Sequence, residues 1–277
     1  MLLDESVWLH ERAWPSIAAY LKRGDIALVP VGATEQHGAH MPLMVDTGWA
    51  TWISEQVAAR TGILVAPPLH FGWSPHHLAY PGSITLRPET LTQVIVDVGE
   101  SLIAHGFRRI ILVNGNRVAN LPPMEIAATK LRFSTGALVS VVDVGLIARK
   151  EIAAMCDSGP GAVDHAADAE TSFMLHAFPQ LVDMARTQEP AQNSPKIRFA
   201  PHIQFDYPLD GDLVLVHPTL EEFGERTNPW GVAATARSAT KEKGQRIVAA
   251  VIDNFVAYIE QVRASKLGSI RRPSIPI

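Results

Sequence analysis

The chain has 277 residues, of which 47% are hydrophobic, so it can bury a large core, and we expect residues 1–277 to form one domain. Its formal net charge of −4 provides no basic surface, which argues against nucleic acid or an anionic membrane as a partner. The single cysteine, Cys156, cannot form an internal disulfide. With neither an apolar signal core nor a run of about 18 apolar residues, the expected location is the cytoplasm.

Short apolar runs alternate with helical patterns along the chain, which predicts an α/β fold with a mainly parallel sheet. Expected strands are Ile26 to Val31, Ile63 to Ala66, Arg109 to Val113 and Leu138 to Val144, and expected helices cover residues 13–22, 47–60, 88–105, 120–133, 161–177 and 231–264. Residues 201–217 interrupt this order, because Asp210 and Gly211 between two apolar runs predict a hairpin or a lid-like excursion. We expect the tail, Ser269 to Ile277, to be irregular and to pack against a neighbouring subunit.

The strand expected at Ile26 to Val31 leads into a polar turn that contains Glu35, His37 and Asp46. Open α/β sheets bind ligands at the carboxyl ends of their strands. Glu35 and His37 are two residues apart, so in extended backbone both side chains reach one cation or two neighbouring cations. The turn therefore indicates most of a metal site. Asp46 could equally be the N-cap of the next helix, and a Glu-x-His pair is not specific by itself.

The connection at residues 70–88 holds three histidines, an indole and a phenol. Connections of this length often bind ligands, and His76 and His77 adjoin Trp73 and Tyr80. The alternative is a rigid surface loop held by its prolines.

A polar turn, Asn114 to Arg117, follows the strand expected at Arg109 to Val113. Its amide groups could hold an anion, or its side chains could reach a site at the edge of the sheet. Asn-Gly is also common turn chemistry.

Residues 161–175 place Asp164, His165, Asp168 and Glu170 just before an apolar run. On a helix, His165 and Asp168 share a face, while Glu170 lies well round from His165. Acidic charge at a helix N-terminus explains the aspartates. It does not explain a histidine and a glutamate so close to the core.

These segments resemble the creatininase family, the metal-dependent creatinine amidohydrolases. The matching pieces run in the family's order and spacing from residue 31 to residue 245, and they read VGATEQHGAHMPLMVDT, GWSPHHLAYPGSITL, VNGNRVAN, HAADAETS and ATKEKGQ. The resemblance implies a doubly wound α/β domain and a homo-oligomer, often a hexamer. It also implies a pair of divalent ions at the carboxyl ends of the strands.

Carried over residue by residue, the resemblance implies specific roles. The implied metal ligands are Glu35, His37, Asp46 and Glu170. Asp46 would bridge the two ions, His165 would carry a proton to the leaving nitrogen, and His77 would lie in the substrate-side loop.

The turn after the central strand departs from the family. The family usually reads NGHGGN there and supplies a metal-binding histidine, whereas this chain has Asn116. An asparagine oxygen is a weaker and harder ligand than imidazole, so we expect one metal position to bind less tightly or to prefer Mn²⁺. Arg117 is expected to replace a cation electrostatically or to bind an anionic group of the substrate. Asp168, where the family often has glutamate, is a milder change.

The predicted function is metal-assisted hydrolysis of a C–N bond in a small molecule, with one or two Zn, Mn or Fe ions per subunit. Candidate catalytic residues are His165, Glu35 and Glu170, and Glu35 becomes the general base if its metal position is vacant. Aromatic side chains in the loop favour a flat substrate, so a lactam, imide or related cyclic amide is the first choice. The residues expected to bind it are Trp73, His77, Tyr80 and Arg117.

Other functions stay open. The chain could be a mononuclear hydrolase of formamides or linear amides, or a diverged non-catalytic protein of the same fold that binds a small molecule. A flavodoxin-like nucleotide binder would use the turn Asn114 to Arg117 for phosphate, but the sequence has neither a GxGxxG nor a GK[ST] motif after an expected strand.

Overall fold

The structure, a computed structural model, describes residues 5–117, 119–157, 164–188, 203–204, 214–215, 218–227 and 229–271. Its central sheet has four parallel strands in the order β2-β1-β3-β4. These strands are β1 Ile26–Val31, β2 Leu64–Val65, β3 Arg109–Asn114 and β4 Leu138–Asp143. The helices are η1 Leu9–Glu11, α1 Trp14–Tyr20, α2 Val45–Thr61, η2 Pro75–His77, α3 Pro88–His105, α4 Leu121–Thr135, α5 Arg149–Met155, α6 Asp168–Ala177, η4 Pro179–Leu181, η5 Met184–Arg186, α7 Leu220–Arg226 and α8 Lys241–Ala264.

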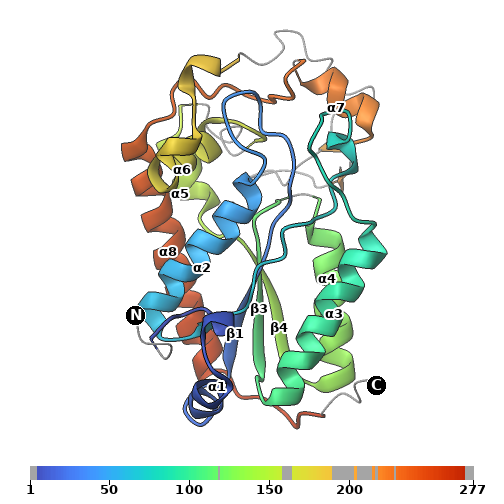
Figure 1. Ribbon diagram of the computed structural model, residues 1–277, viewed down its shortest axis with the longest axis vertical. Coiled ribbons are helices and arrows are strands. Elements are labelled where there is room, and N and C mark those ends of the chain that lie inside the picture. Colours follow the sequence, from blue (N-terminus) through green and yellow to red (C-terminus); the bar gives the residue numbers. More distant parts are fainter. Residues whose placement is uncertain are drawn as a thin grey trace.

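Helices cover both faces of the sheet. Figure 1 shows α2 and α8 on one side of the strands and α3 and α4 on the other. The apolar sequence of β1, IALVPV, serves both layers, because Leu28 belongs to the core under α2 and α8 while Val29 belongs to the core under α3 and α4. The predicted doubly wound, mainly parallel α/β fold is confirmed.

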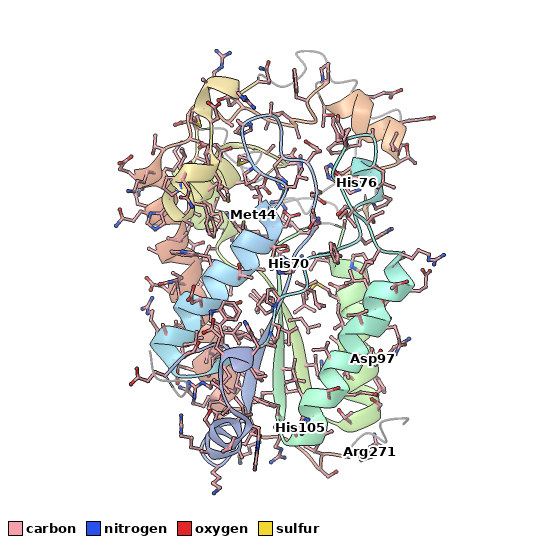
Figure 2. The ribbon with its side chains drawn as sticks, viewed as in Figure 1. Met44, His70, His76, Asp97, His105 and Arg271 are labelled. Carbon is pink, nitrogen blue, oxygen red and sulfur yellow. The ribbon has the colours of Figure 1, made fainter. Side chains whose placement is uncertain are left out.

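The strands end at the same level. Val31 pairs with Asn114 and Asn114 pairs with Asp143, so the loops after β1, β3 and β4 leave the sheet side by side. In Figure 2, Met44 and His70 lie toward this end of the sheet, and His105 and Arg271 lie at the opposite end.

Close backbone packing fixes the start of α2 against this edge. A Cβ at Gly115 would collide with the carbonyl oxygen of Asp46, and a Cβ at Gly32 would collide with Thr47. Only glycine at both positions lets the first turn of α2 reach the ends of β1 and β3.

Several predicted bounds are wrong. Residues 164–167 precede α6, because Ala166 adopts a positive φ of 55° that a right-handed helix cannot contain, so His165 is not on the helix of Asp168. Residues 231–240, predicted as helix, lie ahead of α8, which begins at Lys241 after its N-cap Thr240. Helices α5 and α7 were not predicted.

The segment at residues 201–217 also differs from the prediction. Strands β5 Ile203–Gln204 and β6 Val214–Leu215 pair in parallel, and a hairpin requires antiparallel strands, so the hairpin prediction is wrong for this pair. Asp210 and Gly211, with residues 158–163 and 272–277, lie outside the described residues. Within the described chain, no helix combines the length and apolarity needed to cross a membrane.

Candidate metal centre

The predicted ligands converge at the carboxyl ends of the strands. Glu35 and His37 lie in the turn after β1, Asp46 lies in the first turn of α2, Asn116 follows β3, and Glu170 lies in the first turn of α6. Four are buried, and Glu170 is partly buried. His77 and His165 join them to give three groups of possible metal ligands. Within each group the ligand atoms lie within 4.8 Å of one another, and the groups are Glu35–His37–Asp46, His37–His165–Glu170 and Glu35–His77–His165.

His37 presents a ring nitrogen to two carboxylates. Its Nδ1 lies 3.1 Å from the backbone oxygen of Glu35, which can only accept, so Nδ1 donates. Its buried Nε2 lies 3.2 Å from Asp46 Oδ1 and 3.6 Å from Glu170 Oε2, yet has no hydrogen-bond partner among the described residues. Ligand atoms about 2.1 Å from a tetrahedral cation are about 3.4 Å apart, so each of these two contacts has the spacing of a pair of ligands on one divalent ion. Asp46 belongs with His37 to the group that includes Glu35, and Glu170 belongs with His37 to the group that includes His165.

Glu170 is held in place by the turn before its helix. The backbone N–H of Ala166 donates to Glu170 Oε2 at 2.7 Å, the same oxygen that faces His37. Positive φ at a residue other than glycine is strained, and such residues cluster at functional sites.

Asn116 presents an amide nitrogen, not an oxygen, to the cluster. Its Nδ2 donates to Glu35 Oε2 at 2.7 Å, to Asp46 Oδ2 at 3.2 Å and to Ser74 Oγ at 3.2 Å. An amide nitrogen is a donor without a lone pair for a metal, so the predicted role as a ligand requires the amide to turn over.

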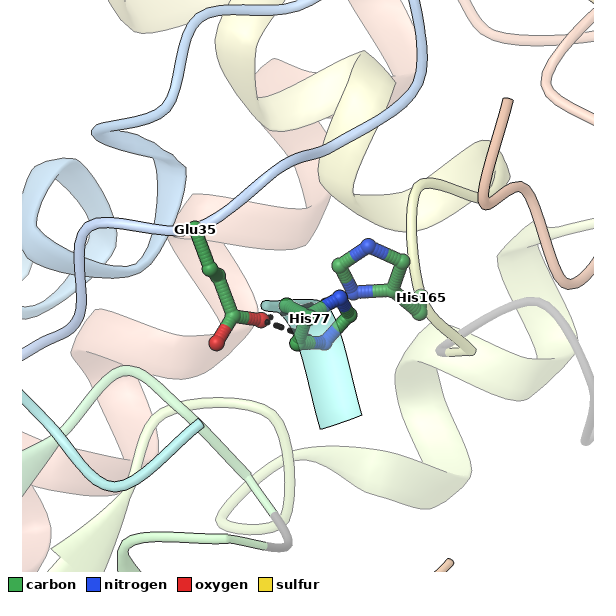
Figure 3. Close-up of side chains that lie close together, drawn as sticks. All are labelled: Glu35, His77 and His165. Atoms are coloured by element: carbon green, nitrogen blue, oxygen red, sulfur yellow. Dashed lines mark ion pairs between the residues drawn. The ribbon is translucent and has the colours of Figure 1, made fainter. Parts of the chain in front are cut away.

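Two histidines share the other oxygen of Glu35. His77 Nε2 lies 3.1 Å from Glu35 Oε1, the pair drawn in Figure 3, and His165 Nδ1 lies 3.6 Å from the same oxygen. The amide nitrogen of Gln36 lies 2.9 Å from both His77 Nδ1 and His165 Nε2, while Gln36 Oε1 accepts from the backbone N–H of Gly38. The same nitrogen donates to the backbone oxygen of Gly231 at 3.2 Å, so the two hydrogens of this amide serve three neighbours.

The electrostatics of the cluster follow from burial and crowded charge. Burial and the neighbouring Glu35 raise the pKa of Asp46, and burial raises the pKa of Glu170 to about 7. Burial opposes the charge of His37, but Asp46 and Glu170 outweigh it and raise the pKa of His37 to about 10. These raised pKa values favour the protonated forms of His37, Asp46 and Glu170, and a bound cation would displace the protons.

Glu35 and His165 shift the other way. Burial favours the neutral form of Glu35, but the imidazoles of His77, His165 and His37 outweigh it and hold the pKa of Glu35 well below its usual range. Burial, with the charges of His37 and His77, holds the pKa of His165 well below 6.5. An ionised carboxylate therefore faces a neutral imidazole.

An aromatic ring from α7 covers these histidines. The ring centroid of Phe223 lies 4.5 Å from that of His77 and 5.7 Å from that of His165, and Phe223 is buried. Gln36, Ser74 and Phe223 were not predicted, although Gln36 and Ser74 lie within the matching segments VGATEQHGAHMPLMVDT and GWSPHHLAYPGSITL.

Of the residues predicted to bind substrate, His77 lies in the cluster itself. The Trp73 side chain packs against the core beneath α3 and α4, and its backbone N–H donates to Asn120 Oδ1 at 2.8 Å. Tyr80 and Arg117 are partly buried, and the charge of Arg117 acts to lower the pKa of Glu170. Their roles in binding stay predictions.

Helix α8 packs against α6 and forms a buried ion pair with its first residue. Lys243 Nζ lies 2.7 Å from Asp168 Oδ2 and 2.8 Å from the backbone oxygen of Ser238, and Asp168 is fully buried. A Cβ at Gly244 would collide with the backbone oxygen of Ser172. The HAADAETS and ATKEKGQ segments therefore pack directly against each other.

Comparisons with known proteins agree with this architecture. The family model described as creatininase, creatinine amidohydrolase, matches residues 10–259. Creatinine amidohydrolase from Pseudomonas putida is 29% identical over 94% of this chain and 98% of its own length. A mycofactocin precursor peptide peptidase from Mycobacterium ulcerans is 32% identical over 89% of this chain and 85% of its own length. A 3-dehydro-scyllo-inosose hydrolase from Thermotoga maritima is 28% identical over 92% and 82%, respectively.

Solved structures match as well. A crystal structure of creatininase superposes with a TM-score of 0.74 and 28% identity, covering 95% of this chain and 100% of that chain. A manganese form and a form described as Zn-Zn type each give a TM-score of 0.73 at 28% identity, over 94% of this chain and 100% of theirs. By the match of the family model, of the full-length relatives and of the fold, this chain belongs to the creatininase family of hydrolases.

Proposed function

We propose that this protein is a metal-dependent amidohydrolase that cleaves the C–N bond of a small cyclic amide. The observation that carries the proposal is that His37 Nε2 lies 3.2 Å from Asp46 Oδ1 and 3.6 Å from Glu170 Oε2, within overlapping groups of possible ligands whose atoms lie within 4.8 Å of one another. One imidazole and two carboxylates suit Zn²⁺, Mn²⁺ or Fe²⁺. The creatininase structures described as a manganese form and as Zn-Zn type support Mn²⁺ and Zn²⁺.

When bound, such a cation lowers the pKa of a water ligand and polarises the carbonyl oxygen under attack. Its ligand His37 is oriented by the backbone oxygen of Glu35, and its ligand Glu170 by the backbone N–H of Ala166. These contacts hold the two side chains toward the same point.

Glu35 and His165 provide the proton transfers. The neighbouring imidazoles keep the Glu35 carboxylate ionised, which makes it a weak base, so it would accept a proton from a water whose pKa a bound cation lowers. His165 Nδ1, 3.6 Å from Glu35 Oε1, would take the proton that Glu35 has received and then give it to the leaving nitrogen, which returns the imidazole to its neutral form. Glu35 thus acts as the general base and His165 as the general acid.

The enclosure of the cluster supports a small substrate. Glu35, His37, Asp46 and His77 are all buried, and Phe223 lies over the histidines. Among the predicted contacts, Arg117 would bind the polar edge of the substrate, with His77, and the loop of Trp73 and Tyr80 would bind its flat face. The relatives are named as a creatinine amidohydrolase, an inosose hydrolase and a peptidase, so the substrate has to be identified by experiment.

The test compares His37→Ala with His105→Ala, which removes an exposed histidine at the far end of the sheet (Figure 2). Metal-loaded proteins are assayed with creatinine, other five- and six-membered cyclic amides, N-formyl amines and short peptides. We expect turnover of a cyclic amide by the wild type and by His105→Ala, and at least a roughly 100-fold loss in His37→Ala together with its metal. Turnover confined to formyl amines or peptides would refute the cyclic substrate. Full activity and full metal content in His37→Ala would refute the site.

A further inference from the structure

Strand β4 forms an open edge of the central sheet. It is the last strand in the order β2-β1-β3-β4, and among the described residues it pairs only with β3. The backbone N–H of Leu138 faces the β3 side, where it donates to the backbone oxygen of Arg108. Because backbone groups alternate in direction along a strand, those of Val139 and Val141 point away from the sheet. Such an edge is a template on which a further strand can pair.

Two pockets follow one another along this edge. The first pocket, of about 590 Å³, is lined by the start of β4 at Leu138, by the end of α4 and by the segment after α8. The second pocket, of about 670 Å³, is lined by residues 141–143 of β4, by the start of α4 and by α8. Helices α4 and α8 lie on opposite sides of the sheet (Figure 1), so the edge of β4 is reached between them.

Large apolar side chains are exposed beside the edge. Ile126 and Phe133 lie on one face of α4, where they are 53% and 79% exposed, and Phe133 also lines the first pocket. Ile147 and Tyr258 line the second pocket. Apolar groups gathered around an open strand edge indicate an interaction surface.

The two ends of the edge carry opposite charge. The described residues that line the first pocket include Arg132, Lys266 and Arg271 and no acidic residue. Those that line the second pocket include Glu125 and Asp143 and no basic residue. Within the described chain, Arg132, Lys266 and Glu125 belong to no ion pair, so these charges are free to pair with another molecule.

We propose that β4 pairs in antiparallel direction with β4 of a second copy of this chain, about a two-fold axis. A two-fold axis sets the basic end of each edge against the acidic end of the other, so Arg132 of each chain faces Glu125 of the partner subunit. The outward backbone groups of Val139 and Val141 gain partners, and two four-stranded sheets become one continuous sheet. The proposal is independent of the candidate metal centre and of the proposed function.

The test reverses the charge at each end of α4. Arg132→Glu alone and Glu125→Arg alone each set like charges against one another across the axis, whereas a chain with both changes pairs opposite charges again. An equimolar mixture of the two single variants also does so, because every contact between unlike chains joins opposite charges. Lys130→Glu is the control, since Lys130 is exposed on α4 and lines neither pocket.

Sedimentation velocity measures the mass of each assembly, and hydrogen exchange follows residues 138–143. We expect the wild type and Lys130→Glu to form dimers or a multiple of dimers, and each single variant to associate at least about tenfold more weakly. The double variant and the mixture should recover the wild-type mass. Residues 138–143 should exchange faster in the single variants, because the outward amides of β4 lose their partners.

Three results would overturn the proposal. The first is a wild type that stays monomeric at roughly 100 µM, which would leave the edge to some other partner. The second is an assembly that neither single variant weakens, or that both weaken without recovery in the mixture and in the double variant. The third is equal exchange at residues 138–143 in the assembled wild type and in a dissociated variant.

Discussion

At the scale of single residues, two amide side chains organise the ionisable groups around Glu35. Asn116 donates to two carboxylates, and the Gln36 amide nitrogen lies within hydrogen-bond distance of two imidazoles and of the backbone oxygen of Gly231. An amide does not titrate, so these two side chains stay neutral across the working pH range. Gln36 is therefore a positioning residue for His165.

Gln36→Met keeps much of the side-chain volume and removes both the donor and the acceptor. We expect kcat to fall roughly 10- to 100-fold, with a changed pH profile and with metal content kept, because His77 and His165 lose the amide that lies 2.9 Å from both rings. Steady-state kinetics across pH and elemental analysis measure this. Gln93→Met, on the exposed face of α3, is the control. Wild-type kcat and pH profile in Gln36→Met would contradict the role.

The sequence identified the titratable residues of the site and Asn116, but it did not predict that Asn116 donates, or that Gln36 and Ser74 take part. The structure brings Glu35, His37, Asp46 and Glu170 into overlapping groups around His37, because parallel strands deliver their loops to one edge. Whether Asn116 accepts or donates depends on carboxylates 70 and 81 residues away in sequence, so no local pattern predicts it.

At the scale of secondary-structure elements, the interface between α6 and α8 supports the candidate metal centre. Asp168 opens α6, two residues before Glu170, and its buried carboxylate receives Lys243 Nζ, Ser172 Oγ and Ser238 Oγ. A charge this deeply buried requires its partner.

Lys243→Met leaves the Asp168 carboxylate without its ammonium partner. We expect the free energy of unfolding to fall by about 3–5 kcal/mol, as for other buried ion pairs that lose one member. Arg60→Met breaks an exposed ion pair between α2 and α8 and should cost about 0–1 kcal/mol. Urea unfolding of both variants measures the difference. Equal losses would show that the Lys243–Asp168 pair contributes no more than a surface pair.

Helix α3 was predicted from the signals at its two ends, whereas α7 was missed although Thr219 and Glu222 form a capping box at its start. Helix α3 runs from Pro88 to His105 as predicted, since Pro88 suits its first turn and Gly106, at a φ of 114°, ends it. Helices α5 and α7 have seven residues each, too few for a clear apolar period. The late start of α6 depends on the backbone of Ala166, a residue whose type gives no warning of a positive φ.

At the scale of the whole molecule, stability and the site are linked through buried polar groups. His40 is buried, with Nε2 3.0 Å from Thr171 Oγ1 and with Nδ1 lacking a partner in the described part of the chain. Burial, and then the charge of His37, lowers the pKa of His40 to about 4. Below about pH 6.5, His40 therefore becomes protonated in the unfolded chain while it stays neutral in the folded protein.

This difference predicts a loss of stability in acid. Below about pH 6.5 the unfolded chain gains a proton at His40 that the folded chain refuses until about pH 4, so the free energy of unfolding falls over this window. The contribution is at most about 3 kcal/mol. His40→Leu should flatten the fall relative to the wild type, while His105→Leu controls for the loss of an exposed histidine. Denaturant unfolding at several pH values measures the slopes, and parallel curves for wild type and His40→Leu would refute the assignment.

The position of Lys243 has a consequence for how the protein is made. His37, Asp46 and Glu170 are all synthesised more than 70 residues before Lys243 reaches its place against Asp168. Until α8 docks, the start of α6 carries an aspartate whose charge has no partner, and burial of that charge is unfavourable. The residues of the candidate metal centre are thus synthesised before the helix that packs behind them, and we expect their final positions to form only after α8 has docked.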